Sequence, residues 1–344
     1  MLTTSYKVVM GYSEKRTEQP NILFIMTDQQ RFDCLGCNGN DVIKTPNIDW
    51  LSEQSANCTS FFIQAPVCVP SRQTFFTGRY PHCHKNRVNY TGMNDDVTLM
   101  QKHLQDEGYS TGFVGKLHYY PPTARYALCT GFDLGLLHDA GPTDQYSDYV
   151  KWLENNNAVP VDKNYRRCKE DTENPYVTVI PDEYHETTWC GVKTREMLGK
   201  LAAGDKPFFL FSSYWKPHSP FELPEPWADM YTDSEIDLPG RVDDSYMTAL
   251  CEPLKTLAAR DGEKHHKIAY DELMWKYRAY YGAVSQIDHE VGLTLKKLEE
   301  LGLSDNTIVI FCSDHGDMMY NHGMIDKNVF FDDAMHVPFM IRYP

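Results

Sequence analysis

The sequence has no long hydrophobic run, either near its start or later. A secretory signal has an apolar core of roughly 7–15 residues, and a membrane-spanning helix needs about 20 apolar residues. Residues 1–20 instead alternate polar and apolar side chains. We therefore expect no signal peptide and no membrane span, and a cytoplasmic location unless a signal has been removed.

The sequence also lacks lysine- and arginine-rich blocks, internal repeats and low-complexity tracts. Together with a formal net charge of −15, this disfavours nucleic acid or an anionic membrane as the main partner. An anionic substrate would have to be held by a local basic pocket. The 344 residues, 42% of them hydrophobic, are typical of a globular protein with one large or two modest domains.

Paired cysteine motifs are scarce, although the chain has ten cysteines. Their irregular spacing, without a secretory signal, favours reduced thiols over a disulfide framework. Cys34 and Cys37 form a C-x-x-C motif, but no second pair lies near it. A zinc or redox role for this pair is therefore disfavoured.

Four short apolar runs are present, and each is typical of a strand buried on both faces. They span residues 21–27, 109–114, 207–213 and 307–312. Segments with helical spacing accompany them at residues 46–56, 98–107, 187–201 and 270–301, and residues 337–343 resemble a short final strand. This alternation predicts an α/β protein with a central, mostly parallel sheet sandwiched between helices.

Two parts of the chain carry no direct catalytic signal. Residues 121–181 show little periodicity, so we expect loops and short helices wrapped over the catalytic face, where such segments set specificity. Asp288 and His289 lie within the longest predicted helix. We expect both of them to be structural or solvated.

Polar side chains follow each of the four predicted buried strands. In open α/β sheets, ligands bind beyond the carboxyl ends of the strands. The residues at these ends are Asp28, Lys116, His118, His218, Asp314 and His315. Lys116 and His118, two apart in an extended segment, would point the same way. The set combines acids suited to a metal with bases suited to an anion, which predicts a functional site at this edge of the sheet.

Cys68 lies in the stretch A-P-V-C-V-P-S-R, between Pro66 and Pro70. Proline is tolerated in the first turn of a helix, so the stretch predicts a short helix that begins near Cys68 and stops at Gly78. The helix N-terminus and Arg72 would attract an anion and activate the thiol. The alternative is that Cys68 is a small buried hydrophobic residue, and these residues alone leave both interpretations open.

The segment Cys68-Val69-Pro70-Ser71-Arg72, followed by residues 77–79, T-G-R, resembles the C-x-P-S-R signature of the sulfatase family. In that family a maturation enzyme oxidises the cysteine to formylglycine, whose hydrate is the nucleophile. The resemblance implies the fold of alkaline phosphatase. It also implies that residues 1–344 form the catalytic domain, and that the smaller C-terminal subdomain of relatives is missing or truncated.

Further segments match the family in the expected order, and they imply roles for individual residues. The implied metal positions are Asp28, Gln29, Asp314 and His315. The implied catalytic positions are Cys68, Arg72, Lys116, His118, His218 and Lys327. In the implied mechanism, Arg72, Lys116 and Lys327 neutralise the sulfate oxygens. His218 protonates the departing alcohol, and His118 acts as the base.

Two of the implied metal positions depart from the commoner family pattern. Many members have a second aspartate where this chain has Gln29, and an asparagine where it has His315. Oxygen-rich shells favour calcium, whereas imidazole suits transition metals. The resemblance implies Ca²⁺ as the cofactor, with Mn²⁺ as the alternative.

The resemblance implies a sulfuric ester hydrolase that acts on a sulfated sugar or a small organic sulfate. One alternative is a phosphonate or phosphate ester hydrolase of the same superfamily. Another is a protein that binds sulfated glycans without cleaving them. A net charge of −15 would repel long polyanions, so we expect a small ester, a monosaccharide or a chain end as the substrate.

Overall fold

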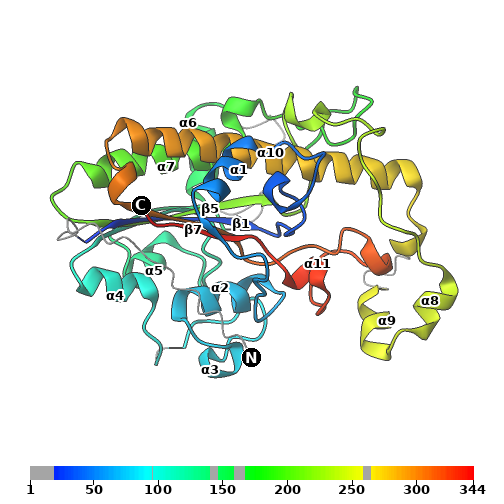
Figure 1. Cartoon of the computed structure of the whole chain (residues 1–344), viewed down its shortest axis with the longest axis horizontal. Coiled ribbons are helices and arrows are strands. Elements are labelled where there is room, and N and C mark those ends of the chain that lie inside the picture. Colours follow the sequence, from blue (N-terminus) through cyan, green and yellow to red (C-terminus); the bar gives the residue numbers. More distant parts are fainter. Residues whose placement is uncertain (1–18, 95, 140–145, 159–166, 259–264) are drawn as a thin grey trace, which may run out of the picture.

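The computed structural model describes residues 19–94, 96–139, 146–158, 167–258 and 265–344, which fold around a seven-stranded sheet (Figure 1). The strands, in their order across the sheet, are β2 (Ala56–Asn57), β7 (Phe339–Arg342), β6 (Thr307–Ser313), β1 (Asn21–Asp28), β5 (Phe208–Pro217), β3 (Ser110–Gly115) and β4 (Leu134–Leu137). The five from β6 to β4 are parallel, whereas β7 and β2 pair antiparallel at one edge. The predicted mostly parallel sheet is confirmed.

The central strand β1 shows why its sequence is a continuous apolar run. Successive side chains of a strand point to opposite faces of the sheet. Leu23 and Ile25 belong to the hydrophobic core on one face, whereas Phe24 and Met26 belong to the core on the other. All four are buried, so neither face of this strand has room for a polar residue.

Helices cover both faces of the sheet (Figure 1). One layer contains α1 (Pro46–Glu53), α6 (Asp148–Asn155), α7 (Glu186–Ala202) and α10 (Tyr270–Glu300). The other contains α2 (Cys68–Thr77), α3 (Pro81–His84), α4 (Met100–Asp106) and α5 (Ala124–Leu128). Towards the right of the view lie α8 (Asp244–Ala249), α9 (Glu252–Ala258) and α11 (Asp332–Met335).

Short 3₁₀ turns connect these elements at η1 (Gly36–Asn38), η2 (Asp182–Tyr184), η3 (Trp227–Asp229), η5 (His265–Lys267), η6 (Ser304–Asn306) and η7 (Asn321–Gly323).

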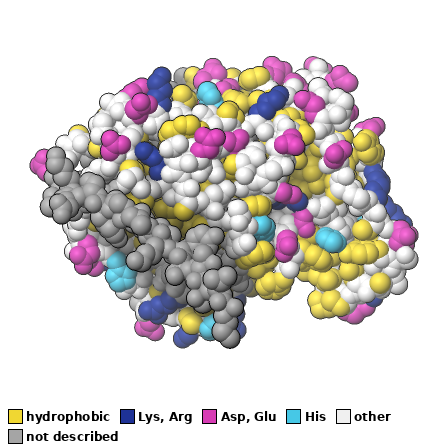
Figure 2. Space-filling view, in the orientation of Figure 1, with side chains coloured by type: hydrophobic (Ala, Val, Ile, Leu, Met, Phe, Trp, Pro, Cys, Tyr) yellow, Lys and Arg dark blue, Asp and Glu magenta, His cyan; other side chains and the backbone are white. Residues whose placement is uncertain are grey.

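On the face shown in Figure 2, acidic side chains are spread over the upper helical layer, and hydrophobic side chains gather at the end formed by α8 and α9. No described helix is both long enough and apolar enough to cross a bilayer. The ten cysteines are all free thiols.

The predicted helices correspond to α1, α4, α7 and α10, with ends that differ by a few residues. Within residues 121–181 the short helices α5 and α6 were expected, but the strand β4 was not. It was missed because it has only four residues and adds to the sheet through a single neighbour, β3. Residues 140–145 and 159–166 of this region lie outside the described part of the chain.

Candidate active site

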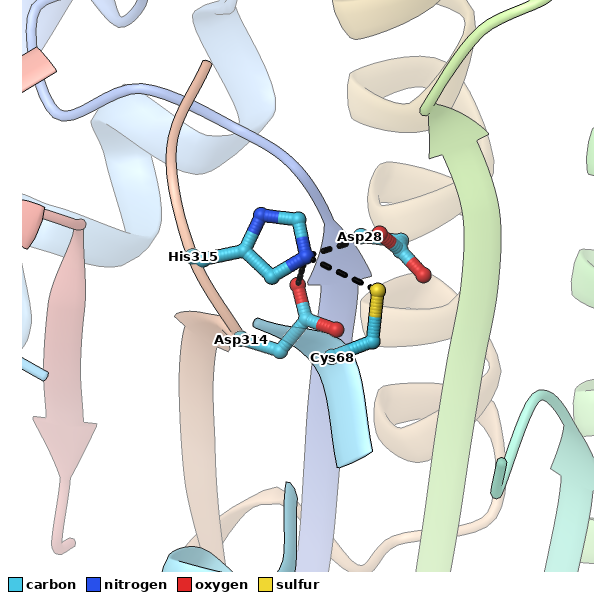
Figure 3. Close-up of side chains that lie close together, drawn as sticks. All are labelled: Asp28, Cys68, Asp314 and His315. Atoms are coloured by element: carbon cyan, nitrogen blue, oxygen red, sulfur yellow. Dashed lines mark hydrogen bonds and ion pairs between the residues drawn. The ribbon is translucent and has the colours of Figure 1, made fainter. Parts of the chain in front are cut away.

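Four side chains that could hold a metal ion meet at the carboxyl ends of β1 and β6 (Figure 3). They are Asp28, Cys68, Asp314 and His315, and one ligand atom of each lies within 4.8 Å of the others. Because β1 and β6 are parallel neighbours with Thr27 opposite Ser313, the residues that follow them are brought together. Cys68 arrives from a third segment, as the first residue of α2.

Cys68 begins α2, as predicted, and the helix ends at Gly78, whose φ of 63° is left-handed. The side chain is only 1% exposed, yet charged and polar groups surround it. Its Sγ lies 3.1 Å from Nε2 of His315. Burial alone would raise the pKa of this thiol, but Lys327, His315 and Lys116 hold it well below the ordinary value. These surroundings favour a reactive or metal-bound sulfur over an inert apolar residue.

The two carboxylates are held by buried cations. Oδ2 of Asp28 contacts Nζ of Lys116 and lies 3.4 Å from the Arg72 guanidinium. Burial would raise the pKa of Asp28, but Lys116, His218 and Arg72 lower it well below its usual range. Asp314 accepts a hydrogen bond of 2.7 Å from Nε of Arg72.

One carboxylate oxygen in the cluster has no hydrogen-bond partner among the described residues, although Nε2 of His315 lies 3.6 Å from it. Oδ1 of Asp28 is buried and accepts no hydrogen bond. A buried polar atom of this kind is costly unless something satisfies it. A cation among the four ligand atoms would do so, and the residues present therefore fit a bound metal.

His315 is oriented to offer a nitrogen to this position. Its Nδ1 donates a hydrogen bond of 2.9 Å to the carbonyl oxygen of Gly316, so Nε2, which faces Cys68 and the two carboxylates, is the nitrogen that could bind a metal in place of its proton. Burial would lower the pKa of His315, but the neighbouring Asp314 and Cys68 raise it to about 9. Two carboxylates, one imidazole and residue 68 form a donor set suited to a divalent cation.

Gln29 borders the cluster but has other partners. Its backbone N–H donates to Asp314 Oδ1 at 3.1 Å. Its side-chain amide donates to Asp317 and Asp326, and its side-chain oxygen accepts a hydrogen bond from Lys327. Gln29 thus adjoins the cluster, and its side-chain oxygen also contacts a lysine; its role as a metal ligand stays a prediction.

Arg72 lies behind the carboxylates and is fully buried. Besides Asp28 and Asp314, its guanidinium donates to the carbonyl oxygen of Lys116 at 2.8 Å and to Oγ of Ser213 at 2.9 Å. These contacts tie α2 to the last residue of β1, to the middle of β5 and to the residues that directly follow β3 and β6. In this arrangement Arg72 positions the ligand carboxylates and does not line the cavity above them.

A cavity of about 460 Å³ opens onto Cys68, and the predicted basic residues converge on it. Lys116, His118, His218 and Lys327 all line it. Nζ of Lys327 lies 2.7 Å from Nε2 of His218, and the neighbouring His118 also lowers the pKa of Cys68. A larger groove of about 850 Å³ runs elsewhere, along α1 and α10, and is not lined by these residues.

The prediction that Lys116 and His118 lie in an extended segment is wrong. His118 has a φ of 58°, in the left-handed region, so the chain turns at this residue. Asp139 stabilises this turn by accepting hydrogen bonds from the backbone N–H groups of Leu117, at 2.6 Å, and His118, at 2.8 Å. Both side chains still reach the cavity.

Several residues of the site were not found from the sequence. Asp139 follows β4, and the strand-end rule would have indicated it had that strand been recognised. Trp215 follows the apolar run of β5, and its ring lies 4.1 Å from Nζ of Lys116. No pattern in the sequence pointed to Tyr90 or Tyr120, which also line the cavity.

Comparisons with known proteins cover almost all of this chain. Residues 20–344 match the family model described as Sulfatase. The chain is 32% identical to an arylsulfatase of Clostridium perfringens, over 95% of this chain and 69% of that protein. It is 29% identical to an ulvan-active sulfatase of Formosa agariphila, over 100% of this chain and 60% of that protein.

Solved structures share the fold. The phosphonate monoester hydrolase of Agrobacterium radiobacter superposes with a TM-score of 0.81 at 24% identity, covering 95% of this chain and 68% of that one. A 2-O GAG sulfatase superposes with a TM-score of 0.65 at 21% identity, covering 95% of this chain and 65% of that one. These matches confirm the predicted α/β fold.

Proposed function

The chain belongs to the sulfatase family, and from this premise we propose that it hydrolyses sulfate esters at the site around Cys68. The observation that carries the proposal is the position of Cys68 at the start of α2. Its Sγ lies among candidate metal ligands on one side and the cavity with Lys116 and Lys327 on the other. A negatively charged ester entering the cavity would meet the nucleophile and the cations together.

The proposal includes conversion of Cys68 to formylglycine by a maturation enzyme. The hydrated aldehyde supplies one hydroxyl to attack sulfur and a second whose deprotonation expels sulfate, which a thiol cannot do. Over the cycle one water is consumed, and one alcohol and one sulfate are released. The low pKa of Cys68, which Lys327, His315 and Lys116 maintain, and its 3.1 Å contact with His315 support a site built for an oxygen or sulfur anion.

The proposed metal would be held by Asp28, Asp314, His315 and residue 68. A divalent cation there supplies Lewis-acid stabilisation of the nucleophile and of the sulfate oxygens. Calcium is the ion that the family resemblance implies. Because the side chain of Gln29 is hydrogen-bonded to Lys327, Asp317 and Asp326, the remaining set has two carboxylates and an imidazole. This composition favours Mn²⁺, with Ca²⁺ as the alternative.

The remaining residues would bind charge and move protons. Lys116 and Lys327 face the cavity and would neutralise the sulfate oxygens. Burial would lower the pKa of Lys327, but Cys68 and the nearby acids raise it above its ordinary value, so this lysine stays charged. His218 shares a 2.7 Å contact with Lys327, and this pair would deliver the proton to the departing alcohol oxygen. His118 would accept the proton from residue 68.

The first experiment joins a mass measurement to a substitution. The peptide that contains residue 68 is expected to be lighter by about 18 Da than its cysteine form, as for an aldehyde replacing a thiol. Cys68→Ala should abolish turnover of 4-nitrophenyl sulfate, whereas Cys129→Ala, at an exposed cysteine, should leave it unchanged. Turnover that survives Cys68→Ala would reject the nucleophile.

A phosphonate monoester is the alternative substrate, because it presents a similar tetrahedral anionic centre and the fold is shared with a phosphonate monoester hydrolase. The two functions are separated by kcat/KM for 4-nitrophenyl sulfate and 4-nitrophenyl phenylphosphonate. We expect the sulfate to be preferred at least about tenfold. A reversed preference would replace the sulfatase proposal with the phosphonate one.

A further inference from the structure

The outer wall of the active-site cavity is aromatic. Tyr90 and Tyr120 both line the cavity that contains Cys68, and Pro122 lies beside them. Their side chains are largely open to solvent, with Tyr90 77% and Tyr120 48% exposed. Neither ring is therefore explained by packing in the hydrophobic core.

The segments that carry these two tyrosines are fixed relative to Cys68. Oδ1 of Asn89 accepts a hydrogen bond of 3.0 Å from the N–H of Val69, the residue after Cys68. Asn86 donates to Gly92 and Thr91 and closes the loop around Tyr90. A Cβ built on Gly92 would lie 3.8 Å from the carbonyl oxygen of Tyr120, so the two segments lie side by side.

The backbone at Tyr90 is unfavourable for a large side chain. Its φ is 64°, in the left-handed region that bulky residues rarely adopt. His118 has a similar φ of 58°, and the two rings meet edge to face with centroids 6.4 Å apart. Such conformations persist where the surroundings hold them, and they cluster at ligand sites. Because the ring of Tyr90 is exposed, its burial in the core does not offset the unfavourable backbone conformation.

We propose that Tyr90 and Tyr120 form a subsite for the alcohol part of the substrate, and that this part is a ring. This inference rests on the proposed sulfate ester hydrolysis. Tyrosine side chains bind flat ring faces, either aromatic or the C–H face of a sugar, at low cost in conformational entropy. The substrate class is a sulfate monoester of a ring-bearing alcohol, with the sulfate at Cys68 and the ring against the two tyrosines.

The test compares ring esters with an acyclic one. The ratio of kcat/KM for 4-nitrophenyl sulfate to that for n-butyl sulfate is measured in wild type, Tyr90→Leu, Tyr120→Leu and Tyr80→Leu. Tyr80 is the matched control, because it is 61% exposed in a nearby segment and does not line the cavity. N-acetylglucosamine 6-sulfate replaces the aryl ester in a second series, which separates an aryl from a sugar preference.

We expect the ratio to fall about tenfold in Tyr90→Leu and Tyr120→Leu, through a higher KM for the ring ester, and to stay constant in Tyr80→Leu. A ratio unchanged in both cavity variants overturns the proposal. Thermal unfolding of each variant identifies any loss that comes from misfolding.

Binding of 4-nitrophenyl sulfate and n-butyl sulfate to Cys68→Ala, measured by calorimetry, tests the subsite without turnover. If the protein binds 4-nitrophenyl sulfate more tightly than n-butyl sulfate but the wild type has no sulfatase activity, the proposed function is rejected and the subsite is kept. If the two esters bind equally well, the subsite is rejected.

Discussion

Arg72 shows how one side chain can organise a site that it does not line. Its planar guanidinium donates in several directions at once, to two carboxylates, a backbone carbonyl and a hydroxyl. A lysine has one compact ammonium group and cannot reproduce this fork. The geometry of Asp28 and Asp314 thus depends on a residue behind them.

We expect Arg72→Lys to lower both kcat/KM and the affinity for the metal by about 10–100-fold, as is typical when a residue supporting metal ligands is replaced. Isothermal titration with Mn²⁺ and steady-state kinetics measure the two effects. Arg79→Lys is the control, because Arg79 is exposed just after α2. A variant that keeps wild-type metal affinity and activity would show that the guanidinium has no positioning role.

The sequence predicted which residues gather at the site better than it predicted their contacts. Asp28, Asp314 and His315 follow buried strands, and the convergence of strand ends brings them together. The partners of Gln29 and Arg72 could not be inferred in this way. Hydrogen bonds of buried side chains are chosen among groups supplied by distant segments, such as Lys327 for Gln29.

At the scale of elements, α1 is capped by a residue of another helix. Its own N-cap residue, Thr45, makes no side-chain capping bond. Asp288 of α10 instead accepts hydrogen bonds from the N–H groups of Asn47, at 3.0 Å, and Ile48, at 2.7 Å. The structural role predicted for Asp288 is confirmed, and it joins two helices of the same layer.

This cap predicts a pH dependence of stability. Burial raises the pKa of Asp288 from 3.8 to about 6, although the donors of Asn47 and Ile48 oppose the shift. The folded protein therefore holds this proton up to a higher pH than the unfolded chain does. The protonated Asp288 carboxyl therefore adds about 3 kcal/mol to the free energy of unfolding at a pH well below 4. This contribution is lost as the pH rises through about 6.

The free energy of unfolding of wild type should therefore fall by about 2 kcal/mol relative to Asp288→Asn between pH 4 and pH 6.5, as measured by urea denaturation. Asp305→Asn, at an exposed carboxylate, should follow the wild-type profile. If Asp288→Asn also ran parallel to wild type, the carboxyl would titrate at its ordinary value and the inferred shift would be wrong.

The long apolar runs made the central strands predictable, whereas β2 and β4 were not. Two or four residues are too few to show a period, and their place in the sheet depends on neighbours that are distant in sequence. β2 pairs with β7, which lies near the other end of the described chain. Such edge strands are set by tertiary contacts and not by local pattern.

At the scale of the whole molecule, the candidate metal site joins the N-terminal and C-terminal parts of the fold. Asp28 ends β1, and Asp314 and His315 follow β6. A ligand that binds only the folded state stabilises it by about 2.7 kcal/mol at one hundred times its dissociation constant. Metal binding should consequently be visible in global unfolding.

After removal of metal with a chelator, we expect Mn²⁺ to raise Tm by about 5 °C, and Ca²⁺ at the same concentration to raise it less. Differential scanning calorimetry measures the shift, and elemental analysis gives the bound ion. Asp314→Asn should lose most of the Mn²⁺-dependent shift. A larger shift with Ca²⁺ would reverse the choice of metal, and the absence of any shift would reject the site.

The order in which the strands are synthesised has a consequence for the growing chain. β1 lies between β5 and β6, yet Thr27 and Cys312, which are hydrogen-bonded in the fold, are 285 residues apart. At about 5–20 residues per second, the ribosome needs roughly 15–60 seconds to make that interval. Until β6 is made, the edge of β1 that β6 will pair with has no partner strand, and His315 does not yet exist to cover Cys68. A nascent chain in this state needs protection from aggregation, and the same interval is when an enzyme could still reach Cys68 before the completed fold buries it.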